Sequence, residues 1–587
     1  MATWLVLLTI GLPWLGALVV WAVGERRSVV GQSLAVVFSA AAGLAALALI
    51  PFAADGVVLR VALGPTFGDF TLVADGLGIF LAVVATVIGS LTVVFSIDYM
   101  RGEEGLARYY ALVLLFVGAM AGLVLAGSLL LMFLFWEITA FCSYALISFH
   151  NDDPKAVAGG VKALIVTQLG GAGLLAGALA VYAALGSYQI GTLLAEAHSM
   201  PPPVLIWIAF GFLAAAAAKS AQVPFQTWLP DAMEAPTPIS ALIHAATMVN
   251  AGVYLLARFY PAFEAVPGWT TAVVSVGLLS ALLAACMALT ASDLKRVLAY
   301  STISQLGYMV YAIGCGAIFA SQFHLLSHSV FKALLFLGAG AVIHAVGTRD
   351  MRRMGGLGAQ MPIVRAAFVI GDLALVGLPL TNGFFSKELV LEGGLAGGPL
   401  WAYIGMLVGV GLTALYTIRM VSMVFYGEAH SVGHAHDAAP AMRIPLGLLA
   451  LGTLTTWLAA GPFGRMLADS LPYHHLHVVS TVDMVVEVVG APATWVALGV
   501  VALGLGIWAI RRALAGLTKA AGPLADFAGS GLGFEWLNGR ITGLVQGAAS
   551  LLGVTQTGQL NLNMVGIVGG LIAILISCRW PPHPWCT

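Results

Sequence analysis

Charged residues are scarce in this chain. Asp, Glu, Lys and Arg make up 9% of the 587 residues, hydrophobic residues make up 60%, and the mean hydropathy is +0.98. Soluble globular domains carry about 25% charged residues, so the composition predicts that lipid rather than water surrounds most of the chain. The formal net charge of −1 gives no electrostatic sign of a nucleic-acid partner.

Motifs for redox cofactors and nucleotides are lacking as well. The five cysteines form no CxxC pair, which argues against iron–sulfur ligation and against a disulfide framework. No P-loop is found and no GxGxxG motif opens a βαβ unit, so nucleotide and flavin sites of those kinds are not indicated. We therefore expect no cofactor and no metal in this chain, and we expect electrons in any associated redox machine to travel through other subunits.

Long apolar segments, in contrast, follow one another along the whole chain. A membrane-spanning helix needs about 20 mostly apolar residues, and about sixteen such segments are present. They lie near residues 2–23, 29–53, 76–97, 108–126, 128–148, 157–184, 203–229, 238–259, 270–290, 296–317, 319–346, 362–396, 400–427, 444–463, 491–510 and 561–578. The pattern predicts an all-α polytopic membrane protein. Its longer loops are expected at 52–75, 428–443, 464–490 and 511–560.

The connecting loops differ in charge. Even-numbered loops hold little beyond Arg60, Arg258 and Arg465, whereas the odd-numbered loops hold Arg26, Arg27, Arg101, Arg108, Lys155, Lys295, Arg296, Arg349, Arg352, Arg353, Arg443, Arg511, Arg512 and Lys519. The positive-inside rule places the odd loops in the cytoplasm. We therefore expect an integral protein of a bacterial inner membrane with both termini on the non-cytoplasmic side. The first segment has its arginines after the apolar run, which favours a retained helix over a signal peptide.

The stretch 511–560 is less apolar than the predicted spans. Its second part, from Phe534 to Val554, is typical of a short amphipathic helix that lies along the membrane surface. An ordinary cytoplasmic loop with one short helix is the equally favoured alternative.

Ionisable residues inside the predicted spans are few and widely spread. Each costs about 2.5–3.5 kcal/mol at the bilayer centre on insertion scales, so their number indicates a polar pathway buried in protein. The candidates are Glu137, Lys162, Lys219, His244, His324, His328, Lys332, Lys387 and Glu388. A carboxylate at mid-depth, such as Glu137, needs a cationic or hydrogen-bonding partner. A static hydrogen bond between helices is the alternative to a transport role.

Lys219 ends an apolar run just before Pro224, which must interrupt the backbone ladder of a helix. Interrupted helices are tolerated in membranes where protein or a watery cavity surrounds them. Burial disfavours the charged form of a lysine and a nearby carboxylate favours it, so Lys219 is predicted to be a tunable proton site. A lysine that snorkels to the membrane surface is the less favoured alternative.

A second interruption is predicted in GLPLTNGFFSKELV, where Pro379, Asn382 and Gly383 precede Lys387 and Glu388. Interrupted helices at corresponding positions of two halves are typical of transporters built from inverted repeats.

Histidines supply further titratable groups. His324, His328 and Lys332 are spaced four residues apart and so share one helix face, and histidine titrates near physiological pH. Metal binding by the two histidines is less favoured, because no third ligand is near in sequence. The loop motifs HSVGHAH and YHHLH are more typical of solvated loops than of a metal site.

Five stretches carry a family resemblance: FWEITAFCSYALISF, KSAQVPFQTWLPDAMEAPTPISALIHAATMVNAGVYLLAR, DLKRVLAYSTISQLGY, HLLSHSVFKALLF and GFFSKE. Together they resemble the antiporter-like proton-pumping subunits of respiratory complex I, most of all the subunit L type of NADH-quinone oxidoreductases. The resemblance runs from about Asp75 to Tyr426, with weaker similarity in TQTGQLNLNMVG.

The resemblance implies two inverted five-helix repeats, each with one interrupted helix. The implied parts are N-terminal helices (1–107), a first repeat (108–260), a second repeat (261–427), C-terminal helices and loops (428–510), and a lateral segment with the last spanning helix (511–587).

The resemblance also implies roles for individual residues. The family's buried glutamate is Glu137, its partner lysine Lys219 and its bridging histidine His244. The central lysine is Lys332, with two histidines beside it, and Lys387 takes the exit-side position. In the family, movement of Lys219 relative to Glu137 changes its proton affinity and drives a proton onward. FMN, iron–sulfur clusters and quinone would then reside in partner subunits.

Some features are more similar to the large subunit of Mrp-type Na+/H+ antiporters. TQLGG places Gly171 where the subunit L type usually has an acidic residue, and GTRD and WEIT are of the Mrp kind. The lateral helix would also extend only about 30 Å. An Mrp-type antiporter subunit, or the antiporter-like subunit of a membrane-bound hydrogenase, therefore stands as the alternative, with Na+ as a second transported ion.

Overall fold

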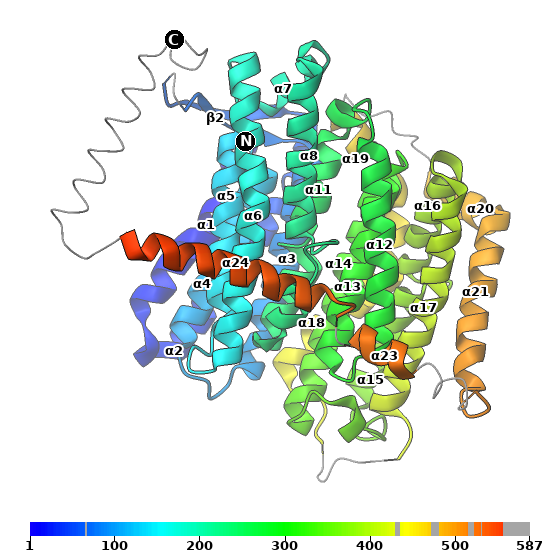
Figure 1. Cartoon of the computed structure of the whole chain (residues 1–587). Helices are drawn as coiled ribbons and strands as arrows, with labels where there is room; N and C mark the ends of the chain where they lie inside the picture. The colour runs from blue at the N-terminus through cyan, green and yellow to red at the C-terminus, as the bar shows by residue number, and fades with distance from the viewer. Residues whose placement is uncertain (65–66, 429–434, 471–479, 515–521, 530, 556–587) are drawn as a thin grey trace. The chain divides into compact units, whose positions relative to one another are not determined.

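A computed structural model describes residues 1–64, 67–428, 435–470, 480–514, 522–529 and 531–555. The chain divides into a large unit, Met1–Gly529, and a small one, Ser530–Thr587. Within the described ranges, thirteen helices are long and apolar enough to cross a membrane. The predicted all-α membrane fold is confirmed (Figure 1).

The helices occur in four groups. The N-terminal group comprises α1 (Ala2–Val23), η1 (Glu25–Arg27), α2 (Ser28–Leu47), η2 (Ile50–Phe52) and α3 (Gly76–Tyr99). The first half comprises α4 (Leu106–Val124), α5 (Leu129–Ile147), α6 (Pro154–Leu185), α7 (Ile190–Glu196), η3 (Ala197–Ser199), α8 (Pro202–Lys219), α9 (Trp228–Asp231), η4 (Ala232–Glu234), α10 (Thr237–Ala241), the π-helical η5 (Leu242–Ala246) and α11 (Asn250–Phe263).

The second half comprises α12 (Trp269–Thr290), α13 (Leu294–Gly314), α14 (Ile318–Val346), η6 (Met351–Arg353), α15 (Pro362–Val376), α16 (Asn382–Gly397) and α17 (Leu400–Phe425). The C-terminal group of the large unit comprises α18 (Pro440–Thr455), η7 (Thr456–Ala459), α19 (Ala460–Ser470), α20 (Thr481–Gly490), α21 (Pro492–Ala509) and α23 (Gly522–Gly529). The small unit contains α24 (Phe534–Thr555), which matches the helix predicted from Phe534 to Val554. The last predicted span, 561–578, lies outside the described residues.

One predicted loop is in fact a β-hairpin. Within 52–75, β1 (Gly56–Ala62) pairs antiparallel with β2 (Asp69–Ala74), and Arg60 forms an ion pair with Asp69 across the two strands. The run VVLRV is rich in β-branched residues, which favour strands. The prediction of a loop was therefore wrong here, because its short strands were overlooked among the longer apolar runs.

Glycines allow neighbouring helices to pack closely. A Cβ on Gly277 of α12 would lie 2.5 Å from the amide nitrogen of Tyr311 in α13, and one on Gly173 of α6 would lie 2.5 Å from the carbonyl oxygen of Gly211 in α8. Small residues at such crossings give membrane helices the contact area that replaces a hydrophobic driving force. These close crossings position the lysine-bearing helices.

Both predicted interruptions are confirmed, and a third one was missed. Helix α8 ends at Lys219, and α15 is separated from α16 by residues 377–381. The segment predicted as one span at 238–259 is also interrupted: α10 leads into the π-helix η5, and α11 begins only at Asn250. No Gly or Pro occurs between Leu242 and Asn250, so the sequence held no breaker signal. Single π-turns of this kind occur often at functional sites.

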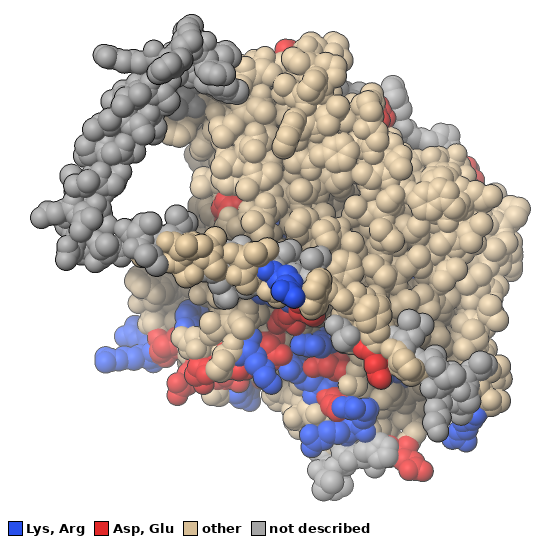
Figure 2. Space-filling view, in the orientation of Figure 1, with Lys and Arg blue, Asp and Glu red and all other residues tan. Residues whose placement is uncertain are grey.

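The charged side chains gather on one face of the molecule. Figure 2 shows Lys, Arg, Asp and Glu concentrated in its lower part, beyond the ends of α2 and α15, while the remaining visible surface is almost free of charge. On the side of the large unit that Figure 2 shows, the uneven distribution of loop charges read from the sequence thus corresponds to one charged region, which we call the charged face.

Candidate functional site

Most of the predicted site residues are buried in the large unit. Seven of them are at most 5% exposed: Lys219, His244, His324, His328, Lys332, Lys387 and Glu388. We call these seven side chains the buried row. Glu137 and Lys162 are half-buried instead.

Lys219 and Glu137 form the first part of the site. The Lys219 Nζ donates a 2.8 Å hydrogen bond to the carbonyl oxygen of Trp136 and lies 4.9 Å from the centroid of the Trp136 ring. Glu137 is the next residue along α5, and its carboxylate acts electrostatically on Lys219. Lys219 and Glu137 thus lie within electrostatic reach of each other, while the hydrogen bond from Lys219 goes to the Trp136 carbonyl.

Gly171 makes room for the Glu137 carboxylate. A Cβ on Gly171 would lie 2.7 Å from Oε1 of Glu137, closer than unbonded heavy atoms approach. Gln168, one turn earlier on α6, is the side chain that hydrogen-bonds Glu137. The departure from the subunit L pattern at Gly171 thus has a physical consequence, because a side chain there would displace the glutamate.

Side chains hold the interruption after Lys219 in place. The Ser220 hydroxyl donates to the carbonyl of Val249 at 2.6 Å, and the amide of Val223 donates to the Ser280 hydroxyl at 2.9 Å. The Trp228 indole donates to the carbonyl of Ala218 at 2.9 Å. The last turn of α8 therefore has polar partners from three directions, as an interrupted helix inside a membrane requires.

His244 lies on the π-helix between the two halves. Its ring is 6.3 Å from the Trp228 ring and 5.7 Å from the Phe336 ring, centroid to centroid. Neither ring nitrogen has a hydrogen-bond partner among the residues described. Lys332 and Lys295 are the cations that act electrostatically on this ring. The position fits the bridging role that the family resemblance implies.

Lys332 and the two histidines occupy one face of α14, as their spacing predicted. Lys332 donates a hydrogen bond to the hydroxyl of Ser301 on α13. His324 is held at both ring nitrogens, by Ser386 at 2.9 Å and by Gln305 at 3.1 Å. His328 lies between them in sequence and packs edge-on against Phe331 at 5.5 Å.

His324 therefore connects α14 to the second interrupted helix, because Ser386 is the residue before Lys387. The Lys387 Nζ lies 3.4 Å from the carbonyl oxygens of Leu375 and Val376 at the end of α15. A cation there complements the negative end of the helix dipole. Glu388 interacts with Lys387, and through Glu392 it adjoins Glu487 on α20.

Lys162 does not join the buried row. It forms a 2.7 Å ion pair with Asp231, which also pairs with Arg296 at 3.3 Å. Arg349 similarly joins Glu234 at 3.0 Å to Asp293 at 3.2 Å. Burial opposes the charge of Arg349, but the hydrogen bond from it to Glu234 and the nearby carboxylates outweigh burial and raise its pKa. These ion pairs tie the acidic turn after the first interruption to the second half.

Two residues that the sequence analysis did not select belong near the site. Lys295 was predicted only as one of the cations of a cytoplasmic loop, but it is buried and donates a 2.5 Å hydrogen bond to the carbonyl of Ala235. Asp372 on α15 is also buried, and Lys332 is the cation that acts on it. Asp372 could have been found from the sequence, because it is an acidic residue in the apolar run VIGDLALV. Glu137 was predicted on the same ground.

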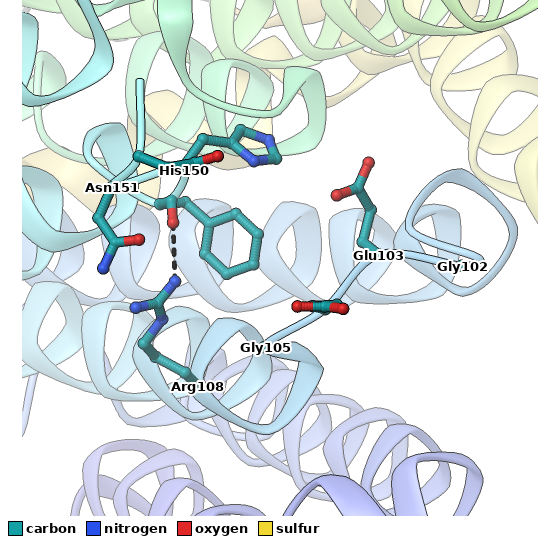
Figure 3. A pocket seen from close by; sticks show the side chains of 9 residues that line it. Gly102, Glu103, Gly105, Arg108, His150 and Asn151 are labelled. Carbon is teal, nitrogen blue, oxygen red and sulfur yellow. Dashed lines mark hydrogen bonds between the residues drawn. The ribbon is translucent and has the colours of Figure 1, made fainter. Parts of the chain in front are cut away.

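Hollows in the large unit lie apart from the buried row. One of about 620 Å³ lies between the α3–α4 and α5–α6 loops, where the Arg108 guanidinium donates a 2.7 Å hydrogen bond to the carbonyl of Phe149 (Figure 3). Glu103 lies across this hollow from Arg108 and Asn151. Another, of about 470 Å³, is lined by charged residues that include Asp293, Arg296 and Arg349. Neither is lined by a residue of the buried row.

The arrangement is suited to proton transfer. Three lysines, three histidines and two carboxylates succeed one another from α5 to α16, and each can gain or lose a proton. Over the described parts of the chain, no group of three His, Cys, Asp or Glu side chains is arranged to hold a metal ion. The loop histidines His430, His434, His474, His475 and His477 lie outside the described residues.

Known proteins share these features. Residues 126–413 match the family model described as NADH:quinone oxidoreductase/Mrp antiporter, TM, and residues 64–110 match that of NADH-ubiquinone oxidoreductase (complex I), chain 5 N-terminus. The chain is 40% identical over 482 residues to NADH-quinone oxidoreductase subunit L of Escherichia coli (strain K12), which covers 80% of this chain and 77% of that protein.

Relatives of the Mrp kind are present too. The chain is 38% identical over 458 residues to Na(+)/H(+) antiporter subunit A1 of Staphylococcus aureus (strain JH9), covering 70% of this chain and 57% of that protein. In the solved Mrp complex from Dietzia sp. DQ12-45-1b, one chain is 28% identical and superposes with a TM-score of 0.81, covering 99% of this chain and 64% of that chain. The resemblance predicted from the five motifs is confirmed. The chain belongs to the family of antiporter-like membrane subunits that includes NADH-quinone oxidoreductase subunit L and the Mrp antiporter subunits.

Proposed function

We propose that this chain is the proton-translocating, subunit L-like membrane subunit of a complex I-type NADH-quinone oxidoreductase. The observation that carries the proposal is the buried row, in which lysines from three separate helices are enclosed together with histidines. Ionisable groups are costly inside a membrane and are retained there mainly for transport. The 40% identity to a subunit L supports the choice of complex.

Translocation would begin at the pair of Glu137 and Lys219. A nearby carboxylate favours the ammonium form of a lysine, whereas burial without one disfavours it. A small movement of the last turn of α8 relative to α5 would therefore make Lys219 bind or release a proton.

The released proton would pass to the second half through His244. Lys332, His328, His324 and Lys387 would then relay it, with water bridging pairs that no direct hydrogen bond joins. The hydrogen bonds of His324 to Ser386 and Gln305 support a fixed orientation of that ring, which a relay needs. Glu388 and Glu392 would lead the proton from Lys387 toward α20.

Partner subunits would complete the site. Leu134 and Phe141, which flank Glu137 on α5, are exposed, as are Ile165 and Leu169 beside Gln168 on α6. An exposed apolar face with a half-buried glutamate at its centre supports contact with a neighbouring membrane subunit. FMN, iron–sulfur clusters and quinone would be bound by other subunits, and this chain would hold none of them.

The charged face would lie in the cytoplasm, in accordance with the positive-inside rule. The protein would then reside in a bacterial inner membrane with both termini on the opposite side. Cysteines introduced at Met1 and in the α14–α15 loop test this orientation. A membrane-impermeant thiol reagent should label the two positions from opposite sides of the membrane.

The experiment that tests the function is reconstitution of the native membrane assembly in vesicles. NADH oxidation should acidify the lumen, and the assembly should show flavin and iron–sulfur absorbance. Glu137→Gln and Lys219→Met should each reduce acidification at least about tenfold while the assembly remains intact. The matched control is Lys155→Gln, which removes an exposed lysine. Normal acidification in the Glu137 and Lys219 variants would refute the proposed pathway.

The alternative function is that of an Mrp-type Na+/H+ antiporter subunit or of a hydrogenase-type complex. It is favoured by the 0.81 TM-score against a chain of the Mrp complex and by the glycine at position 171. Sodium-dependent proton exchange in vesicles, in an assembly without flavin absorbance, would establish the Mrp-type alternative.

A further inference from the structure

Asp372 is a buried carboxylate without a hydrogen-bond partner. The side chain lies on α15, one turn before the helix ends at Val376, and the residue is 4% exposed. Neither carboxylate oxygen has a hydrogen-bond partner within the described part of the chain. A buried carboxylate in this state must be neutralised by a nearby cation or by a proton.

Lys332 is the cation that acts electrostatically on Asp372. Each of the two side chains has the other as the charged group that acts on it. The helix packing agrees with this, because a Cβ on Gly371 would lie 2.8 Å from the Leu335 side chain on α14. Leu335 is three residues beyond Lys332 and therefore on the same side of α14.

Other groups around Asp372 are polar but uncharged. The Ser301 hydroxyl accepts a hydrogen bond from Lys332, and the buried Tyr416 lies within electrostatic reach of Asp372. A lysine, a carboxylate and two hydroxyls from four helices thus converge at one place.

Asp372 also lies on the way to the next lysine. Lys387 contacts the carbonyl oxygens of Leu375 and Val376, which are three and four residues after Asp372. A rise of about 1.5 Å per residue separates these positions by about 6 Å along the helix. Asp372 is therefore placed between Lys332 and Lys387.

We propose that Asp372 is a further proton-carrying residue, which takes a proton from Lys332 and delivers it toward Lys387. The proton moves from the Nζ of Lys332 through a bridging water to an Oδ atom of Asp372, so an ammonium and a carboxylate become an amine and a carboxylic acid without change of total charge. The carboxylic acid then gives the proton up toward Lys387 and recovers its negative charge. This inference rests on the proposed function, and it makes Asp372 a required step, beside His328 and His324, in the transfer from Lys332 to Lys387.

The first measurement is an infrared difference spectrum of the intact assembly between two pH values. If Asp372 changes its protonation, a carboxylic acid C=O band should vanish in Asp372→Asn and shift in Lys332→Met. A permanent counter-ion of Lys332 would produce no such band. If the spectrum of the unmodified assembly shows no such carboxylic acid band, the proposal is overturned.

The second measurement is proton translocation by the same assembly in vesicles. Loss of an acid–base group in a transfer step should slow translocation by about tenfold or more in Asp372→Asn, whereas Asp372→Glu should restore most of it. Asp55→Asn, which changes an exposed aspartate, is the matched control. Wild-type rates in Asp372→Asn would refute the proposal.

Failure of the proposed function can be distinguished from failure of the proposal for Asp372. If the unmodified assembly moves no protons, the proposed function fails, while the infrared band still decides whether Asp372 and Lys332 share a proton. If Asp372→Asn does not assemble, the band shift in Lys332→Met and the activity of Asp372→Glu decide the question.

Discussion

The two halves of this molecule surround their ionisable groups in different ways. In the first half, Glu137 is half-buried beside exposed apolar residues of α5 and α6, and its hydrogen-bond partner Gln168 is itself exposed. In the second half, Lys332 is buried on α14, a helix that packs against α13, α15, α16 and α18. The first acid–base pair lies at the edge of the large unit, and the second is enclosed by it.

This difference has an electrostatic meaning. Charges interact more strongly where water is excluded, so the second half can hold its protonation states without help from another chain. The first half, at an edge, is open to control by whatever membrane subunit covers α5 and α6. Contact with a partner subunit would then act on the first half, and the protonation states would change in the second half.

The largest expected effect concerns whether the halves act in series. Lys219→Met and Lys332→Met should each reduce proton translocation at least about tenfold, equivalent to about 1.4 kcal/mol in the barrier. If one pathway runs through both, the double variant should be no worse than either single one. The rate of vesicle acidification is measured for both single variants and for the double variant. If the fold-loss of the double variant equals the product of the two single losses, a serial arrangement is contradicted.

The carboxylates of the two halves should also differ in their reactivity toward a chemical reagent. A membrane-soluble carbodiimide should modify Glu137 in the isolated chain, because Glu137 is half-buried, and should leave Asp372 unmodified, because Asp372 is 4% exposed. Peptide mass spectrometry gives the extent of modification at each residue. Protection of Glu137 in the full assembly would confirm that a partner covers this face, and equal modification of both residues would contradict the comparison.

A smaller effect is expected from closing the space beside Glu137. In Gly171→Ala the added Cβ would start 2.7 Å from Glu137 Oε1, so the carboxylate must move and its interaction with Lys219 must change. We expect translocation to fall about threefold, since shifts of this size cost well under 1.4 kcal/mol. Gly499→Ala, where a Cβ would meet nothing within 4 Å, is the matched control and should keep the wild-type rate.

The smallest effect concerns the ion pairs between the halves on the charged face. Arg349→Gln breaks contacts with Glu234 and Asp293 and should lower the thermal midpoint slightly, since partly exposed pairs contribute at most about 1 kcal/mol. Arg352→Gln should leave the midpoint unchanged, because the Arg352 side chain itself is exposed, whereas that of Arg349 is half-buried.

The pH dependence of the Arg352 pair has a definite sign. The hydrogen bond from Arg352 lowers the pKa of Asp350, so any stabilisation by this pair is present at neutral pH and is lost as the pH falls through that lowered pKa. Thermal unfolding of both arginine variants in detergent at neutral and at acidic pH checks the two expectations.

Much of the architecture was predictable from local patterns. Every predicted span up to 491–510 contains a helix, and the interruptions after Lys219 and before Lys387 were marked by nearby prolines and polar residues. The pairing of Glu137 with Lys219 was predicted through the family resemblance, and the structure places the two within electrostatic reach. The interruption around His244 was not predictable, because no residue there disfavours a helix.

The partners of two lysines could not be predicted, for one reason. Lys295 adjoins Asp293 and Arg296 at a helix start and was predicted as a loop cation, yet it turns inward to the Ala235 carbonyl. Lys162 was selected for its place in a span, yet it pairs with Asp231 on the charged face. In each case the partner comes from a distant part of the chain, and the spacing of neighbours in sequence carries no information about it.

By itself, the sequence determined that this is a membrane protein with ionisable groups inside its helices, because hydropathy and helix breakers are properties of consecutive residues. Only the tertiary structure decided which of those groups meet. Asp372 became the partner of Lys332, and Glu137 came to lie at an edge, through the packing of helices far apart in the chain. Electrostatic interaction depends on distance and on the exclusion of water, and both are set by that packing.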